Sequence, residues 1–261
     1  MTQTRPASSD WPSATTRVES SPRWVRVRIG GETIADSRRA LLLIQYGPGR
    51  LPTYYFPPDD VRMDRLGPAA GNLPATGGLD YRTVTAVDLV AENAAWIYRD
   101  PPEELASLMG HVSFNWDERT TWYEEEEQVY AHARDPHKRV DVLASSRHLQ
   151  VVIAGQTVAD TRRPRLLFET SLPTRYYIPR EDVRLDLLEP STHKTRCPYK
   201  GEASYWSVRA GDQLVRDAVW SYREPIPECP KIRDLLCFFN ELVDLYVDGE
   251  LQARPRTPWS Q

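Results

Sequence analysis

The stretch RCPYKGEASYW, residues 196–206, places several chemically capable side chains close together in the sequence. Cys197 can act as a nucleophile once it is a thiolate, and a nearby ammonium group such as that of Lys200 favours a thiolate. A partly desolvated lysine can itself be a nucleophile or a proton donor. Glu202 could pair with this lysine or act as a base. These residue types predict a reactive site in which either Cys197 or Lys200 is the reacting group.

The same stretch also predicts a stiff turn that leads into a β-strand. Pro198 fixes its own φ angle, and Gly201 permits a positive φ angle or the close approach of another segment. The alternative to a reactive site is therefore an ordinary turn with a small buried cysteine and a solvated lysine. His193 lies four residues before Cys197 and is a candidate to assist proton transfer.

An internal repeat organises the chain. The segment GGETIADSRRALLLIQ (30–45) matches AGQTVADTRRPRLLFE (154–169) at eight of 16 positions. The segment TYYFPPDDVRMDRLGP (53–68) matches RYYIPREDVRLDLLEP (175–190) at nine of 16 positions. The offset is 124 residues in the first match, 122 in the second and 124 again further along the chain. Collinear similarity over about a hundred residues indicates that a whole domain was duplicated, rather than a short solenoid repeat.

The two copies differ at the loop described above. At the offset of 124, residues 196–206 fall on residues 72–82, where the proline, the glycine and the tyrosine of the loop recur. The other eight positions differ, and among them Cys197, Lys200, Glu202 and Trp206 are replaced by Leu73, Thr76, Gly78 and Arg82. The retained residues are those that a backbone turn needs, and the replaced ones include those that carry chemistry. The sequence therefore predicts that a site on this loop works in the second copy only.

Aromatic side chains near the loop are candidates for the walls of a binding pocket, because tyrosine and tryptophan combine an apolar ring with a polar tip. The candidate binding residues are Tyr177, Arg184, Tyr199, Tyr205, Trp206, Trp220 and Tyr222. Trp220 and Tyr222 have counterparts in the first copy, Trp96 and Tyr98. Their presence in both copies favours a role in packing, as core or pocket-wall aromatics.

Two acidic motifs, DDVRMD (59–64) and EDVRLD (181–186), occur once in each copy. Their aspartates could hold a divalent ion through oxygen ligands. A network of aspartate and arginine that pins a turn explains the presence of the motif in both copies equally well, and we favour this structural interpretation. His193 and Cys197 are four residues apart but have no second cluster of ligands nearby, so we predict no metal site.

Each copy is predicted to be mainly β, in an α+β arrangement. The runs VRVRI (25–29) and LQVVIA (149–154) are β-branched or alternating, and the glycines that follow predict tight turns into further strands. Near the end of each copy, residues 101–116 and 225–240 predict a C-terminal helix. In both segments proline opens the first turn, acidic residues follow, and apolar residues recur every three or four positions.

Composition and patterning give the expected domain boundaries. They are a disordered arm at 1–22, the first copy at 23–126, a connector at 127–147, the second copy at 148–254 and a tail at 255–261. The arm is polar and rich in serine, threonine and proline, with neither a secretion signal nor a membrane span. The connector is charged and weakly periodic, which is typical of a solvated linker.

Charge and cysteine content restrict the class of protein. The chain has 33 basic and 37 acidic residues, so it lacks the basic footprint of a nucleic-acid binder. We expect a small-molecule ligand and neither nucleic acid nor a membrane as partner; the cofactor and the oligomeric state stay open. An odd number of cysteines, three, favours reduced thiols in the cytoplasm. Cys229 and Cys237 lie in or near an apolar segment and are predicted to be core thiols.

The second copy resembles the domain of unknown function 427 family over residues of about 148–253. The hallmark of that family is Thr-x-Cys-Pro-x-Lys-Gly followed by a tyrosine and a second aromatic residue. The matching residues are Thr195, Cys197, Pro198, Lys200, Gly201, Tyr205 and Trp206. The first copy is similar in its strands and at AAWIY (94–98) but departs at the hallmark. The resemblance implies a small, mainly β domain with a C-terminal helix, related to the β-tent folds, and it supports a functional loop.

Three functions remain open. The leading hypothesis is a cytoplasmic enzyme that acts on a small molecule through the Cys-Pro-Tyr-Lys-Gly loop, residues 197–201. The second is a non-catalytic module that binds a metabolite or peptide, with the lysine recognising an anionic group. The third is metal-dependent nucleotidyl transfer at Asp182 and Asp186, a label sometimes given to members of the family. The third is weaker, because the usual glycine–serine turn with a paired Asp-x-Asp is missing.

Overall fold

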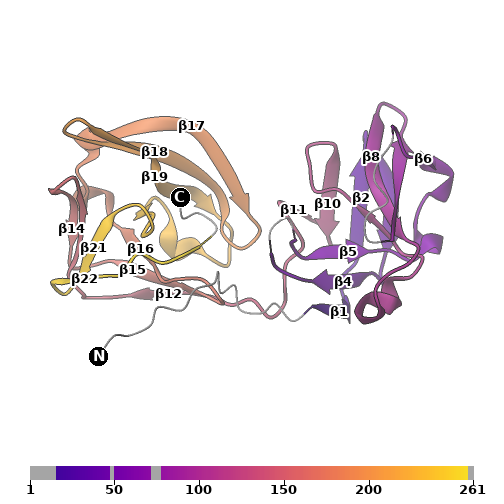
Figure 1. Cartoon of the computed structure of the whole chain (residues 1–261), viewed down its shortest axis with the longest axis horizontal. Helices are drawn as coiled ribbons and strands as arrows, with labels where there is room; N and C mark the ends of the chain where they lie inside the picture. Colours follow the sequence, from indigo (N-terminus) through magenta and orange to yellow (C-terminus); the bar gives the residue numbers. More distant parts are fainter. Residues whose placement is uncertain (1–15, 48–49, 72–77, 258–261) are drawn as a thin grey trace. The chain divides into compact units, whose positions relative to one another are not determined.

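The computed structural model describes residues 16–47, 50–71 and 78–257, and within them the chain forms two compact units (Figure 1). The first domain comprises the described residues up to Asp135, and the second domain begins at Pro136. Both are built mainly from antiparallel β-strands, which confirms the predicted fold class and the two tandem copies. Among the described residues, no helix is long and apolar enough to cross a membrane.

The first domain contains three sheets. The first sheet has the order β1 (Arg17–Ser20), β4 (Leu41–Ile44), β5 (Thr53–Tyr55). The second has the order β11 (Glu127–Val129), β10 (Thr120–Glu124), β2 (Val25–Ile29), β3 (Glu32–Ser37). The third has the order β6 (Leu66–Pro68), β7 (Leu79–Thr85), β8 (Val90–Tyr98), β9 (Val112–Phe114).

The second domain contains two sheets. The seven-stranded sheet has the order β12 (Val140–Ala144), β15 (Arg165–Glu169), β16 (Arg175–Ile178), β20 (Leu236–Phe238), β19 (Gln213–Pro225), β18 (Gly201–Ala210), β17 (Leu188–Cys197). The four-stranded sheet has the order β14 (Gln156–Thr161), β13 (Leu149–Ile153), β21 (Asp244–Val247), β22 (Glu250–Leu251). Figure 1 shows β17, β18 and β19 as long neighbouring strands. The loop of interest joins β17 to β18.

Local structure repeats between the domains. Every second residue of β2 and of β13 is buried, as their alternating sequences predict. The hairpins β2–β3 and β13–β14 carry a register shift at the same place, between Val27 and Arg28 and between Val151 and Val152. Both predicted tight turns are present, with positive φ angles at the residues between the strands. The duplication seen in the sequence is therefore a duplication of structure.

The helix predicted near the end of each copy does not form. Residues 101–116 contain only a six-residue 3₁₀ helix, η3 (Glu103–Leu108), followed by β9. Residues 225–240 contain η6 (Pro230–Ile232), again a 3₁₀ helix, followed by β20. All three residues of β20 are buried between β16 and β19. A short apolar run buried on both faces has no periodicity that separates a strand from a helix, which explains the error.

The structure also differs from the domain boundaries that the sequence predicts. Strand β1 lies within the arm predicted to be disordered, and β11 and β12 lie within the predicted connector. The physical reason is pairing: β1 pairs with β4 and β12 with β15, so these polar segments form edge strands, where charged residues are common. In the predicted tail, Thr257 donates a hydrogen bond to Glu241 at 2.6 Å. Residues 1–15 and 258–261 lie outside the described residues.

Candidate functional site: a charged cluster at the Cys-Pro-Tyr-Lys-Gly loop

The loop is a four-residue turn at the tip of the β17–β18 hairpin. The main-chain N–H of Lys200 donates to the carbonyl of Cys197 at 3.3 Å, which closes the turn. The carbonyl of Lys200 accepts a hydrogen bond from the main-chain N–H of Ile226 at 3.1 Å. Cys197 is paired with Gly201 across the hairpin. The stiff turn that leads into a strand is confirmed, and it fixes where the Cys197 and Lys200 side chains begin.

Gly201 is required by the backbone of this turn. Its φ angle is +108°, and a Cβ atom placed there would lie 3.1 Å from the carbonyl oxygen of Glu224. We expect Gly201→Ala to lower the free energy of unfolding of the second domain by about 3 kcal/mol, from backbone strain and crowding together. Gly211→Ala is the matched control in the next turn, with a φ angle of +58° and nothing within 4 Å, and it should cost about 1 kcal/mol. If urea denaturation shows that the two variants lose the same free energy of unfolding, this account is contradicted.

Three charged side chains meet beside the loop, from three separate elements. The Lys200 ammonium is hydrogen-bonded to Oε2 of Glu169, at the end of β15. The Lys138 ammonium, from the segment before β12, lies 3.2 Å from Oε1 of the same carboxylate. The side chains of Lys138 and Lys200 are each 12% exposed and that of Glu169 is 6% exposed. Charged groups are rarely so buried unless they are paired, and here each carboxylate oxygen has its own lysine.

The ionisation states in this cluster follow from its contacts. Burial lowers the pKa of Lys200, but its interactions with Cys197 and Glu169 raise it by more, so the net shift is upward. Burial raises the pKa of Glu169, but Lys200 and Lys138 outweigh it and the net shift is downward. Glu169 is therefore a carboxylate and Lys200 an ammonium at neutral pH. A lysine nucleophile needs the neutral amine, so this geometry favours Lys200 as a charged group beside Cys197.

Aromatic side chains continue from the cluster along the inner face of β18 and β19. The indole N–H of Trp220 donates to the hydroxyl of Tyr177 at 3.1 Å. The hydroxyls of Tyr205 and Thr195 are 2.7 Å apart. The ring of His193, which is exposed, lies 4.6 Å from that of Tyr205. The rings of Tyr177, Tyr205, Trp220 and Tyr222 form one buried cluster, with Phe239 packed against it and His193 outside it. Most predicted binding residues are thus brought together, as side chains packed against one another.

The other two cysteines are core thiols, as predicted. Cys229 is 3% exposed and Cys237 is fully buried. Burial raises the pKa of Cys229 to about 11 and that of Cys237 to about 12. Both are neutral at physiological pH, and all three cysteines are free. Cys197, which is half-buried, is the most accessible of the three.

Three predicted site residues lie away from the cluster. Glu202 is bound by Lys194 at 2.7 Å and Arg196 at 3.0 Å on the exposed face of the hairpin, so it is not the partner of Lys200. One residue along a strand reverses the face, which is why Glu202 and Ala203 point to opposite sides. Two more are directed elsewhere: Trp206 packs on the aliphatic core of the second domain and Arg184 pairs with Asp186. Tyr199 stays close, with its ring 5.8 Å from the Lys138 ammonium.

The first domain has the same aromatic framework without the charges. The indole of Trp96 donates to the hydroxyl of Tyr55 at 3.1 Å, the equivalent of the contact between Trp220 and Tyr177. At the offset of 124, Glu169 falls on Gln45. The first-copy counterpart of the loop, with Leu73 and Thr76, lies outside the described residues (72–77). The sequence of the second copy thus adds a cysteine, a lysine and a glutamate to a shared framework.

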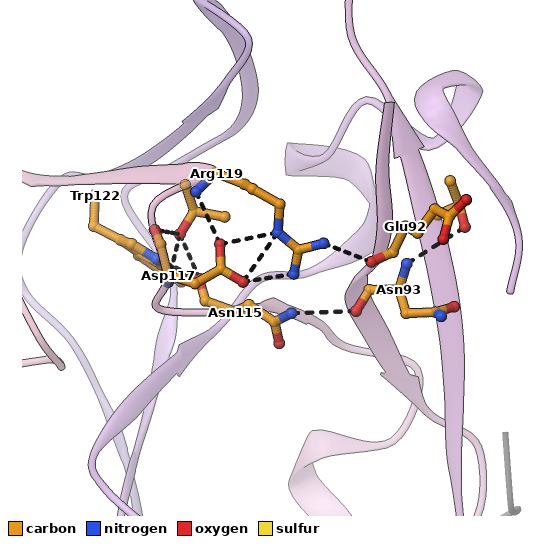
Figure 2. Close-up of polar contacts among 8 residues, drawn as sticks. Glu92, Asn93, Asn115, Asp117, Arg119 and Trp122 are labelled. Carbon is orange, nitrogen blue, oxygen red and sulfur yellow. Dashed lines mark hydrogen bonds and ion pairs between the residues drawn. The ribbon is translucent and has the colours of Figure 1, made fainter. Parts of the chain in front are cut away.

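A second difference between the domains lies in the turn that follows β9 or β20. In the first domain, Asp117 binds the guanidinium of Arg119, which also donates to the main-chain carbonyl of Glu92 at 2.8 Å (Figure 2). The side chains of Asp117 and Arg119 are 27% and 32% exposed. At the position of Asp117 the second domain has Glu241, which forms a bidentate pair with Arg175 at 2.7 Å. That pair is buried and lies against the aromatic cluster.

The aspartates of the acidic motifs are hydrogen-bonded in the same way in both copies. Asp60 accepts hydrogen bonds from Arg39 and Ser37, and Asp182 accepts the equivalent bonds from Arg163 and Thr161. Asp186 is held by Arg184 in the same way that Asp64 is held by Arg62. The described residues contain no group of three or more potential metal ligands. The carboxylates proposed for metal-dependent nucleotidyl transfer are therefore engaged in turns.

The sequence interpretation missed Glu169 and Lys138. One signal for Glu169 was present, because LLFE of the second copy lies on LLIQ of the first, a change from glutamine to glutamate inside a well-matched segment. Lys138 had no such signal, since it precedes the matched part of the repeat. A cavity of about 150 Å³ in the second domain, lined in part by Thr174, Asn240 and Gln252, includes none of the cluster residues.

Comparison with known protein families identifies the family of the chain. The sequence matches the family described as "Domain of unknown function (DUF427)" twice, at residues 17–125 and 141–249. No curated protein matches the chain. Each match lies within one of the two domains of the structure. The matches include β1 and all of β12 except Val140, although the sequence predicted both segments to lie outside the copies. The chain therefore belongs to the DUF427 family, as a tandem protein with one copy in each domain.

Proposed function

We propose that the second domain is an enzyme that acts on a small molecule, with Cys197 as the nucleophile and Lys200 as its charged partner. The observation that carries this proposal is the combination of a half-buried thiol and a buried lysine ammonium on one turn. An ammonium next to a cysteine is the environment in which thiolate nucleophiles occur. The aromatic framework occurs in both copies, whereas this combination belongs to the second copy alone.

The chemistry would proceed through the sulfur of Cys197. The thiolate would form an S–C bond to an electrophilic carbon of the substrate, while the bond from that carbon to the leaving group breaks and the leaving group departs with the electron pair and takes up a proton. Water would then displace the sulfur and restore the thiolate, so that one difficult step becomes two easier ones. The Lys200 ammonium would stabilise negative charge that develops on the substrate, because a preorganised cation in a buried site is far more effective than one in water. His193, exposed beside Tyr205, would exchange protons with solvent. The free thiols support the cytoplasmic location that the sequence predicts.

A specific observation also favours the second candidate, a non-catalytic binding module. Lys138 and Lys200 converge on one carboxylate, so two ammonium groups lie close together, and that of Lys138 also lies 5.8 Å from the ring centroid of Tyr199. Such an arrangement suits recognition of a carboxylate or phosphate. In this alternative Cys197 is part of the wall, and the small-molecule ligand leaves unchanged.

The two candidates are separated by a panel of electrophilic probes given to the full-length protein. The panel contains thioesters, activated esters, alkyl halides and α,β-unsaturated carbonyl compounds, each with and without an anionic group. An enzyme should consume at least one class in multiple turnovers, with a transient increase in intact mass that maps to Cys197. Binding of an anionic compound without consumption or adduct would overturn the catalytic proposal and support the binding module.

A further inference from the structure

Glu169 occupies a central position in the cluster. It ends β15 and lies opposite Val140 in the register of β12 with β15. Next to it, the main chain of Thr170 donates to the carbonyl of Arg139 at 3.0 Å, and the N–H of Arg139 donates to the Thr170 hydroxyl at 2.9 Å. These contacts bring Lys138, one residue earlier, to the same carboxylate. Segments that the sequence assigned to a solvated connector therefore hold one side of the cluster.

We infer that Glu169 is a positioning residue of this site, which holds the Lys200 ammonium in place beside Cys197, and that Lys138 in turn fixes Glu169. This inference rests on the proposed role of Cys197 but assigns a new function to residues outside the loop. Lysine has a flexible four-carbon side chain, and an ammonium that must act on a neighbouring sulfur needs a fixed partner on its other side. Glu169 is that partner, with its second oxygen held by Lys138.

The electrostatics support the same role. Burial alone would lower the pKa of Lys200, and Glu169 is one of the two groups that reverse this shift. The titratable groups around the ammonium come from several elements: Cys197, Glu169, Lys138, Cys229, Cys237 and Tyr222. Burial favours the neutral forms of Cys229, Cys237 and Tyr222, whereas Glu169 is a carboxylate that contacts the ammonium directly. Removing that charge should allow the Lys200 ammonium to move and should lower the pKa of Lys200.

The duplication supports the inference independently of the geometry. The copy that has Cys197 and Lys200 has glutamate at position 169, and the copy that has leucine and threonine instead has the isosteric Gln45. Glutamine fills the same space but carries no charge to hold an ammonium. The three differences between the copies thus occur together, as expected if the glutamate serves the lysine and the cysteine.

The test is Glu169→Gln in the full-length protein, with two readouts. The first is alkylation of Cys197 by iodoacetamide, followed by peptide mapping between about pH 6 and pH 9, a range around the ordinary thiol pKa of about 8.5. We expect the variant to react about three- to tenfold more slowly near pH 7 and its profile to move to higher pH. Glu202→Gln removes one negative charge from the same hairpin without touching Lys200, and it should leave the profile unchanged.

The second readout is acylation of Lys200 itself by acetic anhydride, which reacts with the neutral amine. Loss of Glu169 should increase this rate several-fold near pH 8, because burial then lowers the pKa of Lys200 with less opposition. This readout does not depend on Cys197, so an unreactive thiol would defeat the proposed function while leaving the role of Glu169 testable. Unchanged acylation and an unchanged Cys197 profile in a folded variant would overturn the inference.

A double-mutant cycle shows whether Glu169 acts through Lys200. In a Lys200→Gln background, Glu169→Gln should have no further effect on the alkylation of Cys197, because the intermediary is already absent. Additive effects would show instead that Glu169 acts on the sulfur directly or through the fold, which contradicts a positioning role. Should Glu169→Gln fail to fold, Glu169→Asp tests the same contact, since its shorter side chain keeps the charge but withdraws it from Lys200.

Discussion

Replacing Cys197 by alanine is expected to reduce turnover of any substrate of this protein by about 10³-fold or more, the scale of loss seen when a covalent nucleophile is removed. The reason is that no other described cysteine can supply the reacting sulfur, because Cys229 and Cys237 are buried and protonated. Lys200→Ala should have a large effect as well, because the thiolate loses its charged partner. The measurement is the rate of consumption of the substrate class found with the electrophile panel.

Cys229→Ala provides the matched control. It removes a thiol of the buried aromatic cluster that does not lie on the loop. Turnover should therefore stay within a few-fold of the wild type despite some loss of packing. Cys197→Ala should leave the melting temperature nearly unchanged, since its side chain is small and half-buried. If Cys197→Ala instead mainly lowers the melting temperature and spares turnover, the loop is structural.

Glu241→Ala is expected to lower the free energy of unfolding of the second domain by about 3–5 kcal/mol, because it leaves the guanidinium of Arg175 buried without its partner. The Arg175 side chain is 9% exposed and that of Glu241 is fully buried. Asp117→Ala in the first domain is the matched control. Asp117 occupies the equivalent position, but its pair with Arg119 is partly exposed to water, so the loss should be about 1 kcal/mol or less.

The same pair predicts how stability depends on pH. Burial raises the pKa of Glu241, but hydrogen bonds from Arg175 and Thr257 outweigh it, so the pKa is lowered in the folded state. Its stabilising contribution is thus complete above the unfolded pKa of about 4.3 and is lost as the pH falls through the lower folded pKa. Denaturant titrations of wild type and Glu241→Ala should converge in acid. If the difference in free energy of unfolding between the two proteins stays constant down to about pH 2, the Glu241 carboxylate is not the source of the stabilisation.

The duplication made much of the fold predictable. The strands of each copy have strong alternation, and glycine marks their turns, so the mainly β architecture and the turn at 197–201 follow from local sequence. The residues shared between the copies also predicted the framework, including Trp220 and its counterpart Trp96. Comparing two copies within one chain separated what the backbone needs from what the second copy adds.

The remaining features depend on contacts between distant segments. The segment around β20 was predicted as helix, because a buried three-residue strand shows no periodicity of its own. Glu202 was chosen because it is near Lys200 in sequence, but alternation along β18 turns it to the opposite face. Lys138 reaches the site only because β12 pairs with β15, a pairing that the charged sequence of the connector did not indicate.

The central claim is that Lys200 makes Cys197 the reactive thiol of this chain. Site-resolved alkylation tests it most directly: the native full-length protein is treated with limiting iodoacetamide at about pH 7, where an ordinary thiol is only slightly ionised. We predict that Cys197 is labelled well before Cys229 and Cys237, and that Lys200→Gln slows its labelling about tenfold while Lys194→Gln, on the outer face of the hairpin, does not. Labelling of Cys197 at an equal rate in wild type and Lys200→Gln would contradict the account.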